Sequence, residues 1–446
     1  MSTATDFPST IAAAPSAAPC VASPHLRRPR DVRLDFFRGL AMFVIFVSHV
    51  PWNSWANVLP GRFGFSDATE VFVFCSGIAS AIAFGRVFDE RGALAGTTRV
   101  VMRVWQVYWA HLGMFLIGAA MLAGVDLALR TEGHYFTQAG MHGFFVGDTP
   151  THLIALLTLT YVPALFNILP MYIVMLALIP VVMLAERHGG RAAAGALVIG
   201  MWVIGTTGLV DFPEAPNSTS SWFFNPFAWQ LLFFTGFAFA RGWLPVPPVD
   251  KRLIIAALSV VIVLMPFAFA PLVDSVDVLR NGNQALWPVV SKTYFRPLRL
   301  LHFLSVAYLA WVAVGVSGQH LKGPVVAVVC KVGQQALPTF MAGVILSLAA
   351  GIVLDLIGRD FVRTSLVNMA GIGLLVATAY VAAYFKAGGE LRRPVEQDAA
   401  VRAKPASSPA DTSTTAPLPF GVRFNWSAVF NGRADFTRMA GGGAER

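Results

Sequence analysis

The chain has 446 residues, of which 56% are hydrophobic and only 13% are charged, and its mean hydropathy is +0.62. A soluble protein carries roughly 25% charged residues, so the composition excludes an ordinary soluble enzyme. The net charge of +9 does not indicate nucleic-acid binding, because the basic residues mostly flank apolar runs, where they set membrane topology. Cys20, Cys75 and Cys330 are scattered without a CxxC spacing, so the sequence indicates neither a disulfide framework nor a metal site.

Separate apolar runs of about 20 residues predict an all-α, polytopic membrane protein of about ten transmembrane helices. Residues 1–30 are rich in Ala, Ser and Pro and lack a signal-peptide pattern, so we expect a disordered cytoplasmic lead. Residues 394–446 begin with a low-complexity stretch and are expected to form a disordered cytoplasmic tail. Between them, residues 31–390 form the predicted transmembrane domain, with apolar runs at 34–52, 67–87, 101–124, 168–186, 192–211, 226–242, 252–272, 298–317, 336–357 and 364–385.

The stretch 151–167, THLIALLTLTYVPALFN, is apolar but is interrupted by Thr, His and Pro. If it does not span the membrane, the loops on the N-terminal side hold 18 Lys and Arg residues and the opposite loops hold 7. If it does span, the split becomes 13 against 12. Because cytoplasmic loops carry an excess of Lys and Arg, we predict that 151–167 is re-entrant or interfacial and that both termini are cytoplasmic.

The first predicted span, RLDFFRGLAMFVIFVSH at residues 33–49, carries ionisable residues on one helical face. At about 100° per residue, Arg38 and His49 fall on nearly the same face, and Asp35 lies within about 40° of it. Such groups usually line a protein interior or a substrate path, although an interfacial anchor plus a chance histidine would give the same pattern. At the inner end, Arg33, Asp35 and Arg38 suit an anionic ligand, since Arg presents planar donors.

A second set of polar residues falls at the outer ends of several spans. Two histidines, two carboxylates and an arginine from three spans share one depth, and a histidine beside a carboxylate is the usual general-base pair. Each residue alone has a structural explanation, such as an interface anchor or a buried bundle histidine. The set comprises His49, Asp67 and Glu70, Tyr172, Asn225 and Gln230, and Arg299 and His302.

Five motifs follow one another in this chain as they do in OpgC-type proteins, and the resemblance covers about residues 30–385: RLDFFRGLAMFVIFVSH, GFSDATEVFVFCSG, NILPMYIVML, WFFNPFAWQLLFFTG and RLLHFLSVAYLAW. OpgC-type proteins are inner-membrane enzymes that succinylate osmoregulated periplasmic glucans, and they are similar to the wider type 3 membrane acyltransferases. Their Arg-(ten residues)-His pattern matches Arg38 and His49, which implies that His49 is the catalytic histidine. Their acidic pair at the start of the second helix matches Asp67 and Glu70.

The resemblance implies a multi-pass O-acyltransferase of the bacterial inner membrane, with membrane lipid around it and no nucleic-acid partner. Cytosolic acyl-CoA, succinyl-CoA by the resemblance, would be a co-substrate, with no tightly bound cofactor. A hydroxyl of a periplasmic glucan or other glycan would attack with His49 as base. Asp67 or Glu70 would orient His49, while Arg299 or His302 would stabilise the oxyanion or the succinyl carboxylate.

The alternative is a transporter or flippase of a glycan or lipid-linked intermediate, which would use the same polar layers as a path. A proton-coupled transporter usually carries carboxylates near the membrane midplane. None of the ten predicted spans has a carboxylate in its middle, which favours the enzyme.

Overall fold

A computed structural model describes residues 31–216, 218–315 and 317–387, and within these ranges the regular secondary structure is helical apart from one isolated bridge between Pro213 and Ser221. The predictions for residues 1–30 and 394–446 lie outside the described residues. The helices are α1 (Val32–His49), α2 (Ala68–Ser80), α3 (Arg86–Leu129), α4 (His134–Gln138), α5 (His142–Phe145), α6 (Thr149–Leu157), α7 (Ile168–Thr206), α8 (Pro226–Arg241), α9 (Lys251–Ala268), α10 (Ala270–Ser275), α11 (Asp277–Val290), α12 (Pro297–Val314), α13 (Pro324–Gln334), α14 (Ala336–Ile357) and α15 (Phe361–Lys386).

The predicted all-α membrane architecture is confirmed in its main features. The greater part of each of the ten predicted runs is helical, and within the described ranges six helical stretches are long and apolar enough to cross a membrane. The first of the six runs through α2, a π-helical segment and α3, and another is α7. Helix α1 is not among the six because it carries Arg33, Asp35 and Arg38, and α8 is short. The count of about ten spans therefore stays a prediction.

The stretch Ala68–Leu129 and helix α7 each form one continuous helical stretch but contain two of the predicted spans, and a kink at a glycine lies between the two. Gly92 in α3 (φ 82°, ψ 176°) and Gly190 in α7 (φ 69°, ψ −170°) depart from helical geometry. Both have positive φ, which glycine adopts without the penalty that a Cβ imposes. Each kink separates two runs that the sequence predicts as separate spans, 67–87 from 101–124 and 168–186 from 192–211.

The stretch 151–167 does not form a continuous helix. Its helical part, α6, ends at Leu157, and irregular backbone and a short 3₁₀ turn at Ala164–Phe166 follow. At about 1.5 Å per residue, the nine residues of α6 extend only about 14 Å, roughly half the hydrocarbon thickness. This length agrees with the prediction that the stretch does not span.

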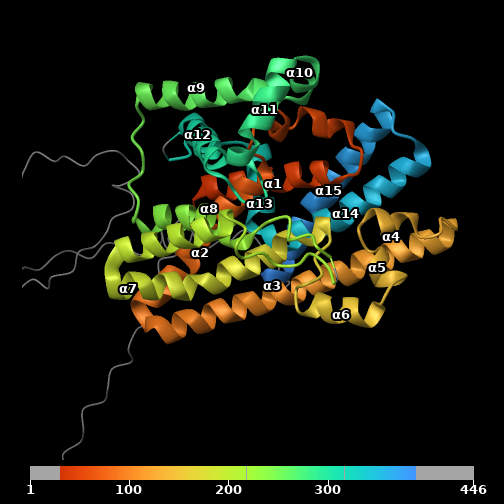
Figure 1. The fold of residues 1–446 in the computed structure, drawn as a ribbon, viewed down its shortest axis with the longest axis horizontal. Coiled ribbons are helices and arrows are strands. Elements are labelled where there is room, and N and C mark those ends of the chain that lie inside the picture. The colour runs from red at the N-terminus through yellow and green to blue at the C-terminus, as the bar shows by residue number, and fades with distance from the viewer. Residues whose placement is uncertain (1–30, 217, 316, 388–446) are drawn as a thin grey trace, which may run out of the picture. The chain divides into compact units, whose positions relative to one another are not determined.

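The helices pack as a bundle in which α1 contacts α2, α13 and α14, and α8 lies between α2 and α7 (Figure 1). We call the end of the bundle at His49 the outer end and the end at Arg33 the inner end. The small helices α4, α5 and α6 gather at one end in Figure 1. Helix α4 lies toward the outer end, because Tyr135 is within electrostatic range of Asp355 and Arg359, and Arg359 donates a hydrogen bond to the carbonyl of Pro51, two residues after His49.

Helices α2 and α8 approach so closely that only glycine fits at the crossing. A Cβ added at Gly77 of α2 would lie 1.9 Å from the carbonyl oxygen of Phe233, and one at Gly236 of α8 would lie 2.3 Å from that of Phe74. Small residues at membrane helix crossings allow this close approach, and van der Waals packing then stabilises the pair. The crossing fixes the position of α2, whose first turn carries Asp67 and Glu70.

Helix α13 is an element that the sequence reading did not predict. It has 11 residues, too few to span a membrane, and it packs along the inner half of α1. A Cβ at Gly333 would lie 1.8 Å from the carbonyl oxygen of Asp35, and one at Gly39 would lie 1.9 Å from that of Val329. The inner charged residues of α1 are therefore covered by a short helix instead of another span.

We predict that Gly77→Ala destabilises the protein by about 1–3 kcal/mol or more, because its methyl group meets backbone atoms that cannot rotate away. Gly124→Ala on α3 is the matched control, since a Cβ there has no neighbour within 4 Å and alanine favours the helix. The melting temperature of each purified variant in detergent measures the difference. An unchanged melting temperature for Gly77→Ala would show that the crossing is looser than described.

Candidate functional site

The start of α2 is organised by a reciprocal capping box between Asp67 and Glu70. The Asp67 carboxylate accepts a hydrogen bond from the backbone N–H of Thr69 at 2.7 Å, and the Glu70 carboxylate accepts one from the backbone N–H of Asp67 at 2.8 Å. These bonds satisfy two of the donors that every helix leaves unpaired at its N-terminus. The predicted pair of carboxylates is thus brought together, with one helical turn holding both in place.

Each carboxylate also pairs with a cation from a distant part of the chain. The Lys292 Nζ lies 2.5 Å from Oδ2 of Asp67, and the Arg299 Nη1 lies 2.8 Å from Oε1 of Glu70. Glu70 is fully buried, and Arg299 is 9% exposed and also donates through Nε to the carbonyl of Val290. Two acids and two bases give no net charge, which allows all four groups to lie at the end of an apolar bundle.

His302 lies beside these pairs, one helical turn after Arg299. Its Nδ1 is 2.7 Å from the hydroxyl of Ser66, while its buried Nε2 has no hydrogen-bond partner within the described residues. The ring occupies the space that a side chain at position 64 would need, because a Cβ at Gly64 would lie 2.5 Å from Nε2. The loop before α2 and the first turns of α12 therefore fix the imidazole between them.

His49 is the last residue of α1. The imidazole lies within electrostatic range of Lys292 and Asp67, the first ion pair. Nδ1 is buried, and the ring forms no hydrogen bond within the described part of the chain. The expected hydrogen bond from His49 to Asp67 or Glu70 is absent there, and these carboxylates pair with Lys292 and Arg299.

We refer to His49, Ser66, Asp67, Glu70, Lys292, Arg299 and His302 as the outer cluster. Of its members, Lys292 and Ser66 were not predicted. Lys292 follows the amphipathic helix α11, and the sequence pattern gives it only as one of several loop cations. Ser66 directly precedes the capping box, and nothing in the pattern distinguishes it from other loop serines. No three His, Cys, Asp or Glu side chains in the described ranges gather as a metal ion would require.

Three predicted site residues lie in helix contacts. Asn225 caps α8 through a bond from the N–H of Ala228, and its own N–H donates to the carbonyl of Thr293, the residue after Lys292. Gln230 donates to the carbonyl of Val198 across the α7–α8 contact. Tyr172 packs edge-on against Phe233, with ring centroids 6.2 Å apart. Neither Gln230 nor Tyr172 bonds to the outer cluster within the described residues, so packing accounts for their positions.

The inner set lies on the other half of α1. Arg33 and Asp35 are buried, 8% and 7% exposed. Arg38 is half-buried, its Nε is shielded from solvent, and the described residues offer it neither a hydrogen bond nor an ion pair. Arg38 therefore forms no ion pair with Asp35, although the two lie on the same helix. A shielded guanidinium without a partner has its full donor capacity left for an anionic ligand.

The outer cluster has the parts needed for acyl transfer to a hydroxyl. An unbonded imidazole can accept a proton, and two cations a few residues apart can stabilise developing negative charge. Arg299 uses Nε and Nη1 in its bonds, while Nη2 forms none within the described ranges. Although both cations form ion pairs, Nη2 of Arg299 therefore remains as a hydrogen-bond donor for a ligand.

We predict that Glu70→Gln and Arg299→Gln each destabilise the protein by about 3–5 kcal/mol, because each leaves a charge buried without its partner. The double variant removes both charges. Its loss of stability should be clearly smaller than the sum of the losses of the two single variants. Chemical or thermal unfolding of the four proteins in detergent forms a double-mutant cycle that measures the coupling. Additive losses would mean that the pair contributes no interaction energy.

No curated protein and no solved structure matches the chain. The family model described as OpgC protein matches residues 30–387, which includes every residue of the outer cluster and the inner set. The match covers well over half of the sequence, and the chain therefore belongs to the OpgC protein family.

Proposed function

We propose that this protein is an integral-membrane O-acyltransferase that moves a succinyl group from cytosolic acyl-CoA to a hydroxyl of a periplasmic glucan. Family membership indicates a glucan-modifying enzyme of the acyltransferase type. The observation that carries the proposal is the unbonded imidazole of His49 beside the Asp67–Lys292 ion pair. A base without a structural partner, next to donors for an oxyanion, suits attack by a hydroxyl on a thioester.

The reaction would proceed through one tetrahedral intermediate. A nitrogen of His49 takes the hydroxyl proton while the oxygen bonds to the thioester carbonyl carbon, and the carbonyl electrons move onto oxygen. Lys292 and the free Nη2 of Arg299 stabilise this oxyanion. When the carbonyl re-forms, the C–S bond breaks, and the CoA thiolate takes the proton from the imidazolium. The products are a glucan ester, free CoA and neutral His49.

The inner set would receive the donor. The two sets are separated along α1 by roughly 16 Å, the rise of 11 residues, so the thioester would lie at the outer cluster while the anionic groups of CoA stay at the inner end. Arg38 is our choice for a phosphate contact, with Arg33 and Asp35 shaping the entrance. This direction matches a protein of the bacterial inner membrane with both termini in the cytoplasm, as the distribution of Lys and Arg favours.

We predict that His49→Ala lowers turnover by about 10²- to 10⁴-fold, the usual contribution of a positioned base. The assay reconstitutes the protein in lipid vesicles with succinyl-CoA and a glucan, and mass spectrometry counts the esters formed. His188→Ala, an exposed histidine on α7, is the matched control and should retain full activity.

Both variants are compared at equal abundance and with melting temperatures near that of the unaltered protein. An unchanged rate for His49→Ala would exclude the base mechanism. If no ester forms but labelled glucan crosses the vesicle membrane in a protein-dependent way, the alternative of a transporter or flippase takes its place.

We predict that Arg38→Lys raises the KM for acyl-CoA about tenfold or more, because lysine keeps the charge but loses the planar pair of donors. The KM for the glucan should stay unchanged. Arg280→Lys, an exposed arginine at the outer end, is the control. Full activity of Arg38→Lys at low acyl-CoA concentration would reduce Arg38 to an anchor at the membrane interface.

A further inference from the structure

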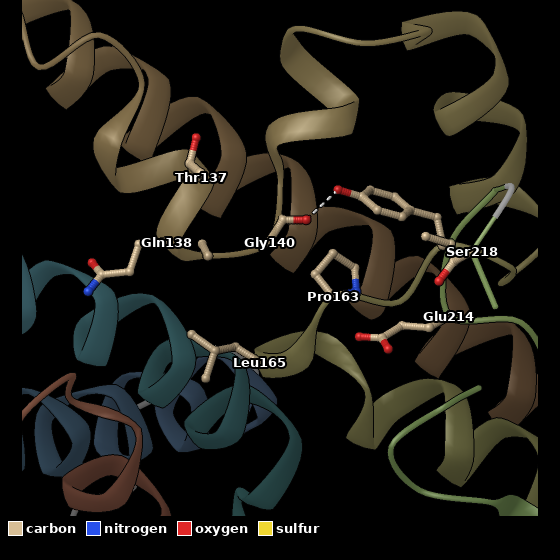
Figure 2. Close-up of a pocket in the computed structure, with 10 residues that line it drawn as sticks. Thr137, Gln138, Gly140, Pro163, Leu165, Glu214 and Ser218 are labelled. Atoms are coloured by element: carbon tan, nitrogen blue, oxygen red, sulfur yellow. Dashed lines mark hydrogen bonds between the residues drawn. The ribbon is translucent and has the colours of Figure 1, made fainter. Parts of the chain in front are cut away.

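A pocket of about 390 Å³ with a mixed polar and apolar lining lies at the outer end of the bundle, apart from the outer cluster. It is formed by α4, the turn that follows α4, the segment around Pro163 and the loop between α7 and α8. Its volume falls within the range of about 300–1,000 Å³ that small-molecule sites occupy. Figure 2 shows Gln138 and Glu214 on opposite sides of Gly140 and Pro163.

The chemistry of the lining fits a neutral ligand rich in hydroxyl groups. Thr137, Gln138 and Ser218 supply hydroxyl and amide groups that both donate and accept hydrogen bonds. The carboxylate of Glu214 is half-buried and forms no hydrogen bond within the described residues, and burial raises the pKa of this carboxyl. None of the described lining residues is Lys or Arg, so the cavity offers no cation to a phosphate or a succinate.

An aromatic residue forms one wall of the cavity. Tyr161 is 3% exposed, and its hydroxyl donates to the carbonyl of Gly140 at 2.9 Å, the dashed line in Figure 2. Burial raises the pKa of this phenol to about 12, so it stays protonated and the bond persists at neutral pH. The bond fixes the ring between the two chain segments, so the buried ring holds the wall in place, and the polar side chains of the lining remain to bond the hydroxyls of a ligand.

A hydrogen bond links the loop of the cavity to the segment that carries Lys292. The Tyr294 hydroxyl, two residues after Lys292, donates to Asp211, three residues before Glu214, at 3.1 Å. On the other side of the cavity, Tyr135 of α4 lies within electrostatic range of Arg359, which donates to the carbonyl of Pro51. The cavity therefore belongs to the same end of the bundle as the proposed base, on structurally coupled loops.

We propose that this cavity is a second sugar subsite, which holds a glucose unit of the acceptor other than the one being acylated. The assignment rests on the proposed function for the identity of the acceptor as a glucan. A polymer bound at two places gains affinity because the second contact is intramolecular. Longer glucans should therefore have a lower KM than short ones, and the cavity residues should account for the difference.

The test compares a glucose disaccharide with a longer linear glucose oligosaccharide, using full-length protein in lipid vesicles. Glu214→Gln should raise the KM for the long acceptor at least about tenfold, the loss expected for a hydrogen bond to a charged group. The kcat, and the KM for the disaccharide, should not change. Thr137→Val is a second cavity variant with the same expectation, and Glu132→Gln, exposed at the same end, is the control.

A binding measurement without acyl donor separates this inference from the proposed function. The Kd of the long oligosaccharide, from titration calorimetry, should rise in Glu214→Gln and stay unchanged in Glu132→Gln. If no ester forms with any acceptor while this difference persists, the proposed function fails and the sugar subsite stands. If esters form and Glu214→Gln and Thr137→Val keep the length dependence of the unaltered protein, the subsite is refuted. Tight binding of phosphocholine in place of the oligosaccharide would refute it in favour of a lipid headgroup.

Discussion

Glu70 of α2 and Arg299 of α12 form an ion pair 2.8 Å long between elements 229 residues apart in the chain. Either charge alone would be very costly at this depth, so the two helices must meet with their first turns aligned. That alignment brings His302 of α12 against Ser66 and brings Lys292 to Asp67. The outer cluster is therefore a consequence of one contact that the buried charges make obligatory.

The sequence alone predicts the helices well and their connections less well. Apolar runs of membrane length identify every long helix, because the bilayer demands this pattern. The kinks at Gly92 and Gly190 also fall between predicted spans. Helices α11 and α13 escape the prediction, since a short helix that packs on its neighbours needs neither the length nor the uniform apolarity of a span. Their existence depends on tertiary contacts that no single stretch of sequence encodes.

The candidate site was predictable to the extent that its residues lie at helix ends. His49, Asp67, Glu70, Arg299 and His302 carry ionisable groups at one depth, and that depth follows from the apolar runs. The sequence does not predict which acid pairs with which base, because the pairing depends on how each helix is rotated about its axis and on the paths of the loops. Lys292 is the clearest case: it displaces His49 as the partner of Asp67, and only the fold of the chain after α11 places it there.

Asp67 combines three bonds in one residue: it caps α2 through Thr69, pairs with Lys292, and donates its own N–H to Glu70. A substitution of Asp67 would remove the cap of α2 and the counter-charge of Lys292 at the same time. Asn would keep the cap but leave the lysine without its counter-charge, while Glu would keep the charge on a longer side chain that caps less well. Neither replacement preserves both functions, so a change at this position is better tolerated when Lys292 changes with it. Asp67 and Lys292 should consequently co-vary among related sequences.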